Sequence, residues 1–178
     1  MNRKLEFYVG PTNSGKTYNA MKKLKEANSG LYLAPLRLLA LEGYEDLKES
    51  KIEASLITGE EQQLSEDAAH ICSTIEMLDF DLEVDVAVID EVQMLEDIDR
   101  GWAWVNAIIG VPAKKVIMTG SVNALEAVKR IVQYLDEELE VVRHKRKNPL
   151  LVLQKWTPLE KLENGTALIA FSRAEVLK

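Results

Sequence analysis

The sequence predicts an α/β protein built on a doubly wound parallel sheet, and three observations lead to this fold class. Short apolar runs alternate with longer segments of helical periodicity, which is typical of parallel strands joined by crossover helices. One run, residues 84–89, is apolar almost without interruption, as a central strand covered on both faces requires. The first run, residues 5–9, leads into a glycine-rich turn and then a helix.

The glycine-rich turn spans residues 10–17 and fits the phosphate-loop pattern G-x-x-x-x-G-K-[ST]. Between a strand and a helix, such a loop binds phosphate through backbone N–H groups and the positive end of the helix. We expect Lys16 to hold the β- and γ-phosphates and Thr17 to bind Mg²⁺. The expected nucleotide-binding residues are Gly10, Pro11, Thr12, Asn13, Ser14, Gly15, Lys16 and Thr17. The alternative is a glycine-rich strand-to-helix turn that carries a lysine by chance.

The composition is that of an ordinary globular protein. At 178 residues, with 47% hydrophobic and 29% charged residues, the chain is long enough for one domain, or for one domain and a piece of another. The formal net charge of -7 argues against a basic protein that coats any polyanion, but it leaves room for a local groove along a nucleic-acid backbone. Cys72 is the single cysteine, which excludes a disulfide or a cysteine metal site within one chain.

The expected location follows from the apolar segments. The N-terminal apolar run is too short for a signal peptide or a transmembrane helix, and no other stretch reaches the required length. We therefore expect a cytoplasmic protein without a membrane segment, in which Cys72 is a buried, reduced thiol.

The segments after the loop continue the alternation as far as residue 77. Arg37, early in the second helical segment, is expected either to be solvated or to contact a phosphate. A polar turn follows at residues 58–61, and Ser73 or Thr74 is expected to cap a short helix. The expected elements are helices at residues 16–27 and 35–50 and strands at residues 31–34, 52–57 and 68–72.

The strand at residues 84–89 delivers Asp90 and Glu91 to its carboxyl end, which is the ligand-binding edge of an open parallel sheet. Two adjacent carboxylates there have separable tasks. Asp90 is expected to hold Mg²⁺ and Glu91 to orient and deprotonate an attacking water. The alternative is a solvated acidic turn after the strand.

The remaining elements of this domain are a helix at residues 100–109, a strand at residues 115–118, a helix at residues 122–135 and a strand at residues 138–142. The paired tryptophans Trp102 and Trp104 either stack on bases or pack the helix. Thr119 and Ser121 follow the strand at residues 115–118, so their hydroxyls are expected on the same sheet edge as Asp90.

The character of the chain then changes. Residues 143–149 are basic, and the segment has the look of an interdomain linker. An apolar strand at residues 166–171 and a helix at residues 172–178 begin a new βα unit. The expected organisation is a nucleotide-binding domain at residues 1–142, a linker at residues 143–165 and the first βα unit of a further domain at residues 166–178.

The order of these motifs resembles that of the mitochondrial-degradosome RNA helicases, the family of suppressor of Var number three, within superfamily two. The resemblance covers nearly the whole chain, and its most specific features are the Pro35 to Glu42 string and the glutamine at Gln93. It implies a RecA-like lobe of a DExH/D-box ATP-dependent RNA helicase. The motifs are residues 10–17, 35–42, 58–61, 73–77, 88–93 and 100–104.

The resemblance also implies roles for individual residues. Lys16, Thr17, Asp90 and Glu91 would handle ATP and Mg²⁺, and Gln93 with the coupling residues Thr119 and Ser121 would link the γ-phosphate to lobe movement. The implied partners are single-stranded RNA, with DNA as an alternative, and an exoribonuclease or other RNA-decay protein. The implied RNA-contacting residues are Pro35, Leu36, Arg37, Thr58, Gly59, Thr74, Glu76 and Met77.

Two departures from the family pattern limit the expected activity. Thr119-Gly120-Ser121 is a loose version of the usual Ser-Ala-Thr, and the rest of the second lobe, with its arginine fingers, is absent. We therefore expect weak ATP binding, very slow hydrolysis and no unwinding by this chain alone. The alternatives are a thymidine-kinase-like deoxynucleoside kinase and a non-catalytic, nucleotide-dependent RNA-binding module.

Overall fold

The computed structural model describes residues 3–146, 151–152, 156–170 and 172–176, and it divides the chain into two units, residues 1–147 and 148–178. The first unit contains an eight-stranded sheet in the order β4-β3-β5-β2-β6-β7-β1-β8. Every pairing between these strands is parallel except that of β4 with β3. The strands are β1 Lys4–Val9, β2 Gly30–Ala34, β3 Ala54–Ile57, β4 Gln62–Gln63, β5 His70–Thr74, β6 Val84–Ile89, β7 Ala113–Gly120 and β8 Leu139–Arg143.

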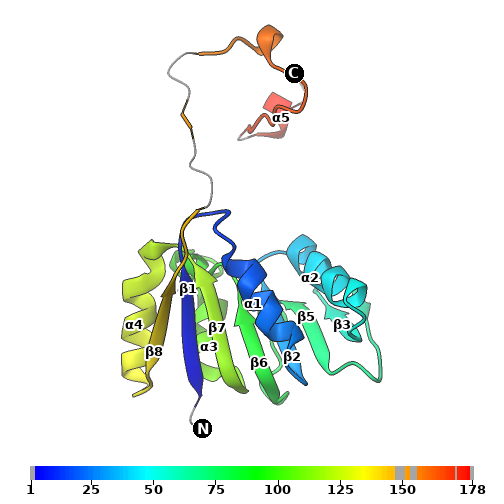
Figure 1. Cartoon of the computed structure of the whole chain (residues 1–178), viewed down its shortest axis with the longest axis vertical. Coiled ribbons are helices and arrows are strands. Elements are labelled where there is room, and N and C mark those ends of the chain that lie inside the picture. Colours follow the sequence, from blue (N-terminus) through cyan, green and yellow to red (C-terminus); the bar gives the residue numbers. More distant parts are fainter. Residues whose placement is uncertain (1–2, 147–150, 153–155, 171, 177–178) are drawn as a thin grey trace. The chain divides into compact units, whose positions relative to one another are not determined.

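Helices cover both faces of this sheet (Figure 1). Side chains of α1 and α2 pack in one core cluster, and side chains of α3 and α4 pack in another on the opposite face. The predicted doubly wound α/β fold is therefore confirmed. The helices are α1 Lys16–Lys25, α2 Arg37–Glu49, α3 Gly101–Gly110 and α4 Leu125–Tyr134, with short 3₁₀ turns η1 Ile75–Met77, η2 Val92–Glu96 and η3 Val122–Ala124.

The nearly continuous apolar run of β6 is explained by these two cores. Ala87 and Ile89 lie in the cluster beneath α3 and α4, whereas Val86 and Val88 lie in the cluster beneath α1 and α2. Because successive side chains of a strand point to opposite faces, a strand with helices on both sides needs apolar residues at every position. The residue after this buried run, Asp90, is consequently placed at the carboxyl edge of the sheet.

Some predicted elements differ in detail. α2 begins at Arg37 and not at Pro35, because Leu36 is extended (φ -139°, ψ 148°) and carries the chain out of β2. The expected capped helix after Ser73 is only the 3₁₀ turn η1, and neither Ser73 nor Thr74 supplies a side-chain cap there. A 3₁₀ helix of this length is typical, because its hydrogen-bond geometry is poorer than that of an α-helix.

The polar turn at residues 58–61 closes a hairpin that the sequence did not reveal. Thr58 is buried, and its hydroxyl both donates to the carbonyl of Glu61 and accepts from the N–H of Glu61, each at 3.0 Å. These bonds reverse the chain so that β4 pairs antiparallel with β3. A two-residue strand carries too little periodicity to be predicted.

The second unit contains the short helices η4 Leu159–Lys161 and α5 Arg173–Val176. The expected strand at residues 166–171 is not formed: residues 166–170 have no strand conformation, and Phe171 lies outside the described residues. An isolated apolar segment gains strand stability only by pairing, and the described part of this unit offers no strand to pair with. At the other boundary, β8 continues to Arg143, one residue into the predicted linker.

Candidate nucleotide and RNA site

The phosphate loop and the acidic pair meet at the carboxyl edge of the sheet. β6, β7 and β1 are neighbours, so the segments that follow them emerge side by side. The hydroxyl of Thr17, in the first turn of α1 where the phosphate loop ends, donates to Asp90 Oδ1 at 3.0 Å. The geometry therefore brings together the loop and the carboxylate pair that the sequence predicted would share one rim.

The phosphate loop curls through two left-handed residues before α1 begins. Asn13 (φ 58°) and Gly15 (φ 80°) are left-handed, and Gly15 is the N-cap of α1. Glycine adopts this conformation without steric cost, which lets the chain curl before the helix begins. Residues 12–18 and Glu91 line a cavity of about 240 Å³ at the N-terminus of α1.

Lys16 lies folded back on its own loop. Its side chain is largely buried, and Nζ donates to the carbonyl of Pro11 at 2.9 Å. A protonated amine held at this point places positive charge beside the cavity, where the positive end of α1 also points.

Asp90 is buried and accepts hydrogen bonds from three hydroxyl groups, those of Thr17, Thr119 and Tyr32. Tyr32 OH lies 2.9 Å from Oδ2, and burial together with the charge of Asp90 raises the pKa of Tyr32. Backbone contacts also hold the residue: its N–H donates to Leu33 and its carbonyl accepts from Trp104 Nε1 at 2.9 Å. The carboxylate is thus fixed in place. Carboxylate and hydroxyl oxygens are ligands that Mg²⁺ prefers, so Thr17 and Asp90 fit this ion.

Glu91 and Gln93 contact residues at the end of β7. Glu91 adopts a left-handed conformation (φ 53°), which is strained for a residue with a Cβ. The amide of Gln93 donates to Glu91 Oε2, while Gln93 Oε1 accepts from the N–H of Ser121 at 3.1 Å. The Glu91 N–H donates to the Thr119 hydroxyl at 3.3 Å. The expected coupling residues therefore contact both members of the Glu91–Gln93 pair.

The expected RNA-contacting residues lie on the same edge, after β2, β3 and β5. Leu36 and Met77 are exposed, whereas Pro35 and Thr58 are buried. Arg37 forms an ion pair with Glu60 from the polar turn. An exposed ion pair of this kind contributes little stability, so it leaves Arg37 accessible to a competing phosphate.

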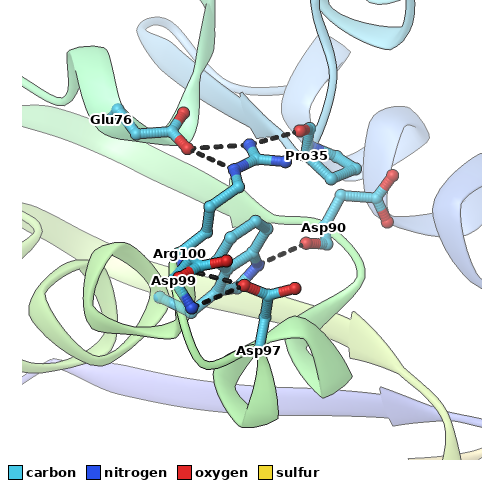
Figure 2. A network of polar contacts seen from close by, with 7 residues as sticks. Pro35, Glu76, Asp90, Asp97, Asp99 and Arg100 are labelled. Atoms are coloured by element: carbon cyan, nitrogen blue, oxygen red, sulfur yellow. Dashed lines mark hydrogen bonds and ion pairs between the residues drawn. The ribbon is translucent and has the colours of Figure 1, made fainter.

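Arg100 joins two of these segments, as Figure 2 shows. Its Nε lies 2.8 Å from Glu76 Oε1, and its Nη2 lies 2.6 Å from the carbonyl of Pro35. The guanidinium also lies over the ring of Trp104, 5.4 Å from the centroid.

Sequence reasoning missed Tyr32, Arg100 and Arg146 as members of this edge. Tyr32 carries no signal within a buried strand. Arg146 lies in the basic segment after β8, which was predicted only as a linker. Its Nε donates to the carbonyl of Thr12 at 2.9 Å. Of the two tryptophans, Trp104 is fully buried and packs α3, whereas Trp102 is 56% exposed.

Comparison with known proteins identifies the family. The model of the "DEXQ-box helicase domain of Suv3" matches residues 1–144, and the DEXQ letters are those of Asp90 to Gln93. The mitochondrial ATP-dependent RNA helicase SUV3 homologue of Caenorhabditis elegans is 40% identical over 98% of this chain and 25% of its own length. Human SUPV3L1 is 40% identical over 99% of this chain and 23% of its own length. The chain therefore spans about a quarter of the relatives it matches.

Solved structures agree on the fold. The helicase domain of Pyrococcus furiosus Hef aligns with a TM-score of 0.55 at 22% identity, covering 79% of this chain and 35% of that one. Yeast Dbp5 bound to ADP and protein partners aligns with a TM-score of 0.56 at 19% identity, covering 78% and 44%. At these identities the likeness shows the RecA-like fold alone.

The relatives correct the expected location. They are named as mitochondrial proteins, so the cytoplasmic prediction is wrong. That prediction rested on the lack of a secretory or membrane segment, which bears on export and membrane insertion but not on import into mitochondria. No helix in the part of the chain described above is long and apolar enough to span a membrane. By the family match over residues 1–144, this chain belongs to the Suv3 family and contains its DEXQ-box helicase domain.

Proposed function

We propose that this chain is the ATP-binding lobe of an ATP-dependent RNA helicase, in which hydrolysis drives RNA translocation or unwinding by the longer protein. The observation that carries the proposal is the contact of Thr17 with Asp90, because it sets a phosphate-binding loop opposite a carboxylate pair. The relatives are named ATP-dependent RNA helicases, which supports the same reading. The names of the relatives also disfavour the deoxynucleoside-kinase alternative.

Each polar group at the edge has a separate task in this proposal. Lys16 turns from the Pro11 carbonyl to the β- and γ-phosphates, and Thr17 and Asp90 hold Mg²⁺. When bound, Mg²⁺ neutralises phosphate charge. Glu91 orients the attacking water and accepts its proton, and Gln93 keeps the Glu91 carboxylate aimed at the cavity through their side-chain bond.

The nucleic-acid partner in the proposal is single-stranded RNA, running over the ends of β2, β3 and β5. Exposed Leu36 and Met77 offer apolar contact to bases, and Arg37 and the loop at Gly59 offer contact to phosphates. DNA remains the alternative substrate, and an exoribonuclease or other RNA-decay protein remains the proposed partner of the longer protein.

The domain organisation is part of the proposal. Residues 143–165 would link this lobe, residues 1–142, to a second lobe that begins at residues 166–178. The family's second lobe carries the arginine fingers, each typically worth about 10³ to 10⁵ in rate. The greater length of the relatives supports this arrangement.

An ATPase titration with single-stranded RNA tests the function. We expect this chain to bind Mg²⁺-ATP weakly and to turn over far more slowly than about 1 s⁻¹, with or without RNA. Glu91→Gln should lower the residual rate by about 10²-fold or more while keeping nucleotide binding. Glu96→Gln, at the exposed end of η2, is the matched control and should change neither.

The outcomes separate the three hypotheses. RNA-stimulated turnover near 1 s⁻¹ would contradict the expected weakness of this chain. Transfer of phosphate to a deoxynucleoside would support the deoxynucleoside-kinase alternative. A third outcome is RNA binding that depends on nucleotide, together with a hydrolysis rate that Glu91→Gln does not lower. This outcome would support the non-catalytic module.

A further inference from the structure

We propose that Arg100, acting with Trp104, is the positioning residue through which RNA occupancy at the ends of β2 and β5 changes the affinity of the nucleotide site. The inference rests on the proposed function and adds to it a specific path between the two sites. It concerns residues that have no role in nucleotide or metal binding in that proposal.

Arg100 lies between two segments of the proposed RNA track. One guanidinium contacts the carbonyl of Pro35, after β2, and the carboxylate of Glu76, in η1 after β5. Figure 2 shows both contacts on the same side chain. If RNA displaces either segment, the Arg100 guanidinium must therefore move with it or lose its contact to it.

Arg100 also offsets a negative charge on this track. Glu76 lies on the proposed RNA track, where a carboxylate would repel phosphate. Its ion pair with Arg100 at 2.7 Å offsets that charge. An incoming phosphate competes with Glu76 for the guanidinium, because arginine binds both anions with the same planar fork. Arg100 thus has two alternative partners, and RNA selects between them.

Trp104 connects Arg100 to Asp90. The guanidinium lies over the Trp104 ring, and Trp104 is fully buried with its Nε1 on the Asp90 carbonyl at 2.9 Å. A buried indole cannot shift without disturbing that bond, because protein interiors are close-packed. The backbone that carries the Asp90 carboxylate is therefore tied to the position of Arg100.

The local fold holds Arg100 at this place. The Asp97 carboxylate accepts from the N–H groups of Asp99 at 3.0 Å and Arg100 at 2.8 Å. Gly101 begins α3 in close contact with the preceding turn: a Cβ there would lie 2.3 Å from the Leu95 carbonyl oxygen. These contacts of Arg100 and Gly101 thus fix the position of the Arg100 side chain at the N-terminus of α3.

The test measures nucleotide affinity with and without RNA on this chain. The dissociation constant of a non-hydrolysable ATP analogue with Mg²⁺ is determined by fluorescence titration, alone and with saturating single-stranded oligouridylate. The ratio of the two constants is the coupling factor, and linkage requires the same factor for RNA affinity. We expect a factor of at least about fivefold in the wild type. Because it is a ratio, a uniform loss of nucleotide affinity cancels.

Arg100→Lys keeps the positive charge but cannot hold Pro35 and Glu76 with one planar fork, so its coupling factor should fall to about one. Trp104→Phe keeps an apolar ring but loses the Nε1 donor, and it should have the same effect. Arg130→Gln on α4 and Trp156→Phe in the second unit are matched controls at exposed positions and should keep the wild-type factor.

Wild-type coupling that survives Arg100→Lys would overturn the inference, even if Trp104→Phe fails to fold. A wild type that binds both ligands without coupling would overturn it as well, while leaving the proposed function in place. A wild type that binds neither ligand would contradict the proposed function itself.

Discussion

Thr17 and Asp90 lie 73 positions apart in the sequence, and the hydroxyl of the first donates to the carboxylate of the second at 3.0 Å. The bond joins the start of α1 to the end of β6, across the neighbouring carboxyl ends of β1, β7 and β6. The two oxygen-bearing groups are therefore neighbours, as the proposed Mg²⁺ site requires.

Replacing Thr17 tests this metal position. Thr17→Val keeps the side-chain shape but removes the oxygen, and we expect ATP affinity in the presence of Mg²⁺ to fall by about 10-fold or more. In EDTA the affinity should change far less. The measurement is a titration of a fluorescent ATP analogue under both conditions. Thr166→Val, in the second unit, is the matched control, and an equal loss with and without Mg²⁺ would assign Thr17 to packing alone.

Lys16 is expected to strengthen ATP binding without adding to the free energy of unfolding. Lys16→Met should weaken ATP binding by about 10- to 150-fold, because a charged hydrogen bond to phosphate is lost. The free energy of unfolding should not fall, since a largely buried amine is replaced by an apolar side chain of similar length. Lys23→Met, on the exposed face of the same helix, should leave affinity unchanged. A clear loss of stability in urea unfolding for Lys16→Met would contradict this view of the loop.

Glu6 should give the fold a stability that depends on pH. Burial alone would raise the pKa of its carboxyl, but hydrogen bonds from Lys115, Lys4 and Tyr8 outweigh this and leave the pKa below its ordinary value. A carboxyl whose pKa is lowered by folding contributes stability that is present above the unfolded pKa and is lost as the pH falls through the folded one.

The check is urea unfolding of Glu6→Gln between about pH 7 and about pH 3. The wild type should lose more free energy of unfolding over this range than the variant does. Glu66→Gln, in an exposed loop, should follow the wild-type curve. Parallel curves for Glu6→Gln and the wild type would show that Glu6 has the same pKa in both states.

Lys51 holds a strained position after α2. Its φ is 60°, and the turn it makes lets Ile52 N–H donate to the Leu47 carbonyl at 3.0 Å. A left-handed residue with a Cβ costs about 1–2 kcal/mol, and glycine loses about 0.5–1 kcal/mol in chain entropy. Lys51→Gly should therefore stabilise the fold by about 0.5–1 kcal/mol, measured by urea unfolding. Glu45→Gly, inside α2, should destabilise it by about 1 kcal/mol, and a loss at both sites would contradict the assignment.

Local pattern predicted most of the fold. The alternation of apolar runs with helical periodicity placed β1, β2, β6 and β7 and their covering helices, because each pattern reflects burial of one or both faces of a single element. The elements that were missed or shortened depend on neighbours. β4 needs β3 beside it, and residues 166–170 lack a paired strand in the described part of their unit.

The candidate site divides in the same way. Its phosphate loop and its acidic pair are contiguous motifs, and the sequence by itself determined both, together with the edge on which they meet. Only the tertiary structure decided that Tyr32 bonds the Asp90 carboxylate, that Trp104 bonds its carbonyl and that Arg100 joins Pro35 to Glu76. The physical reason is sheet order: these contacts join residues from strands that are neighbours in space but distant in sequence, and periodicity within one segment carries no information about which segment lies beside it.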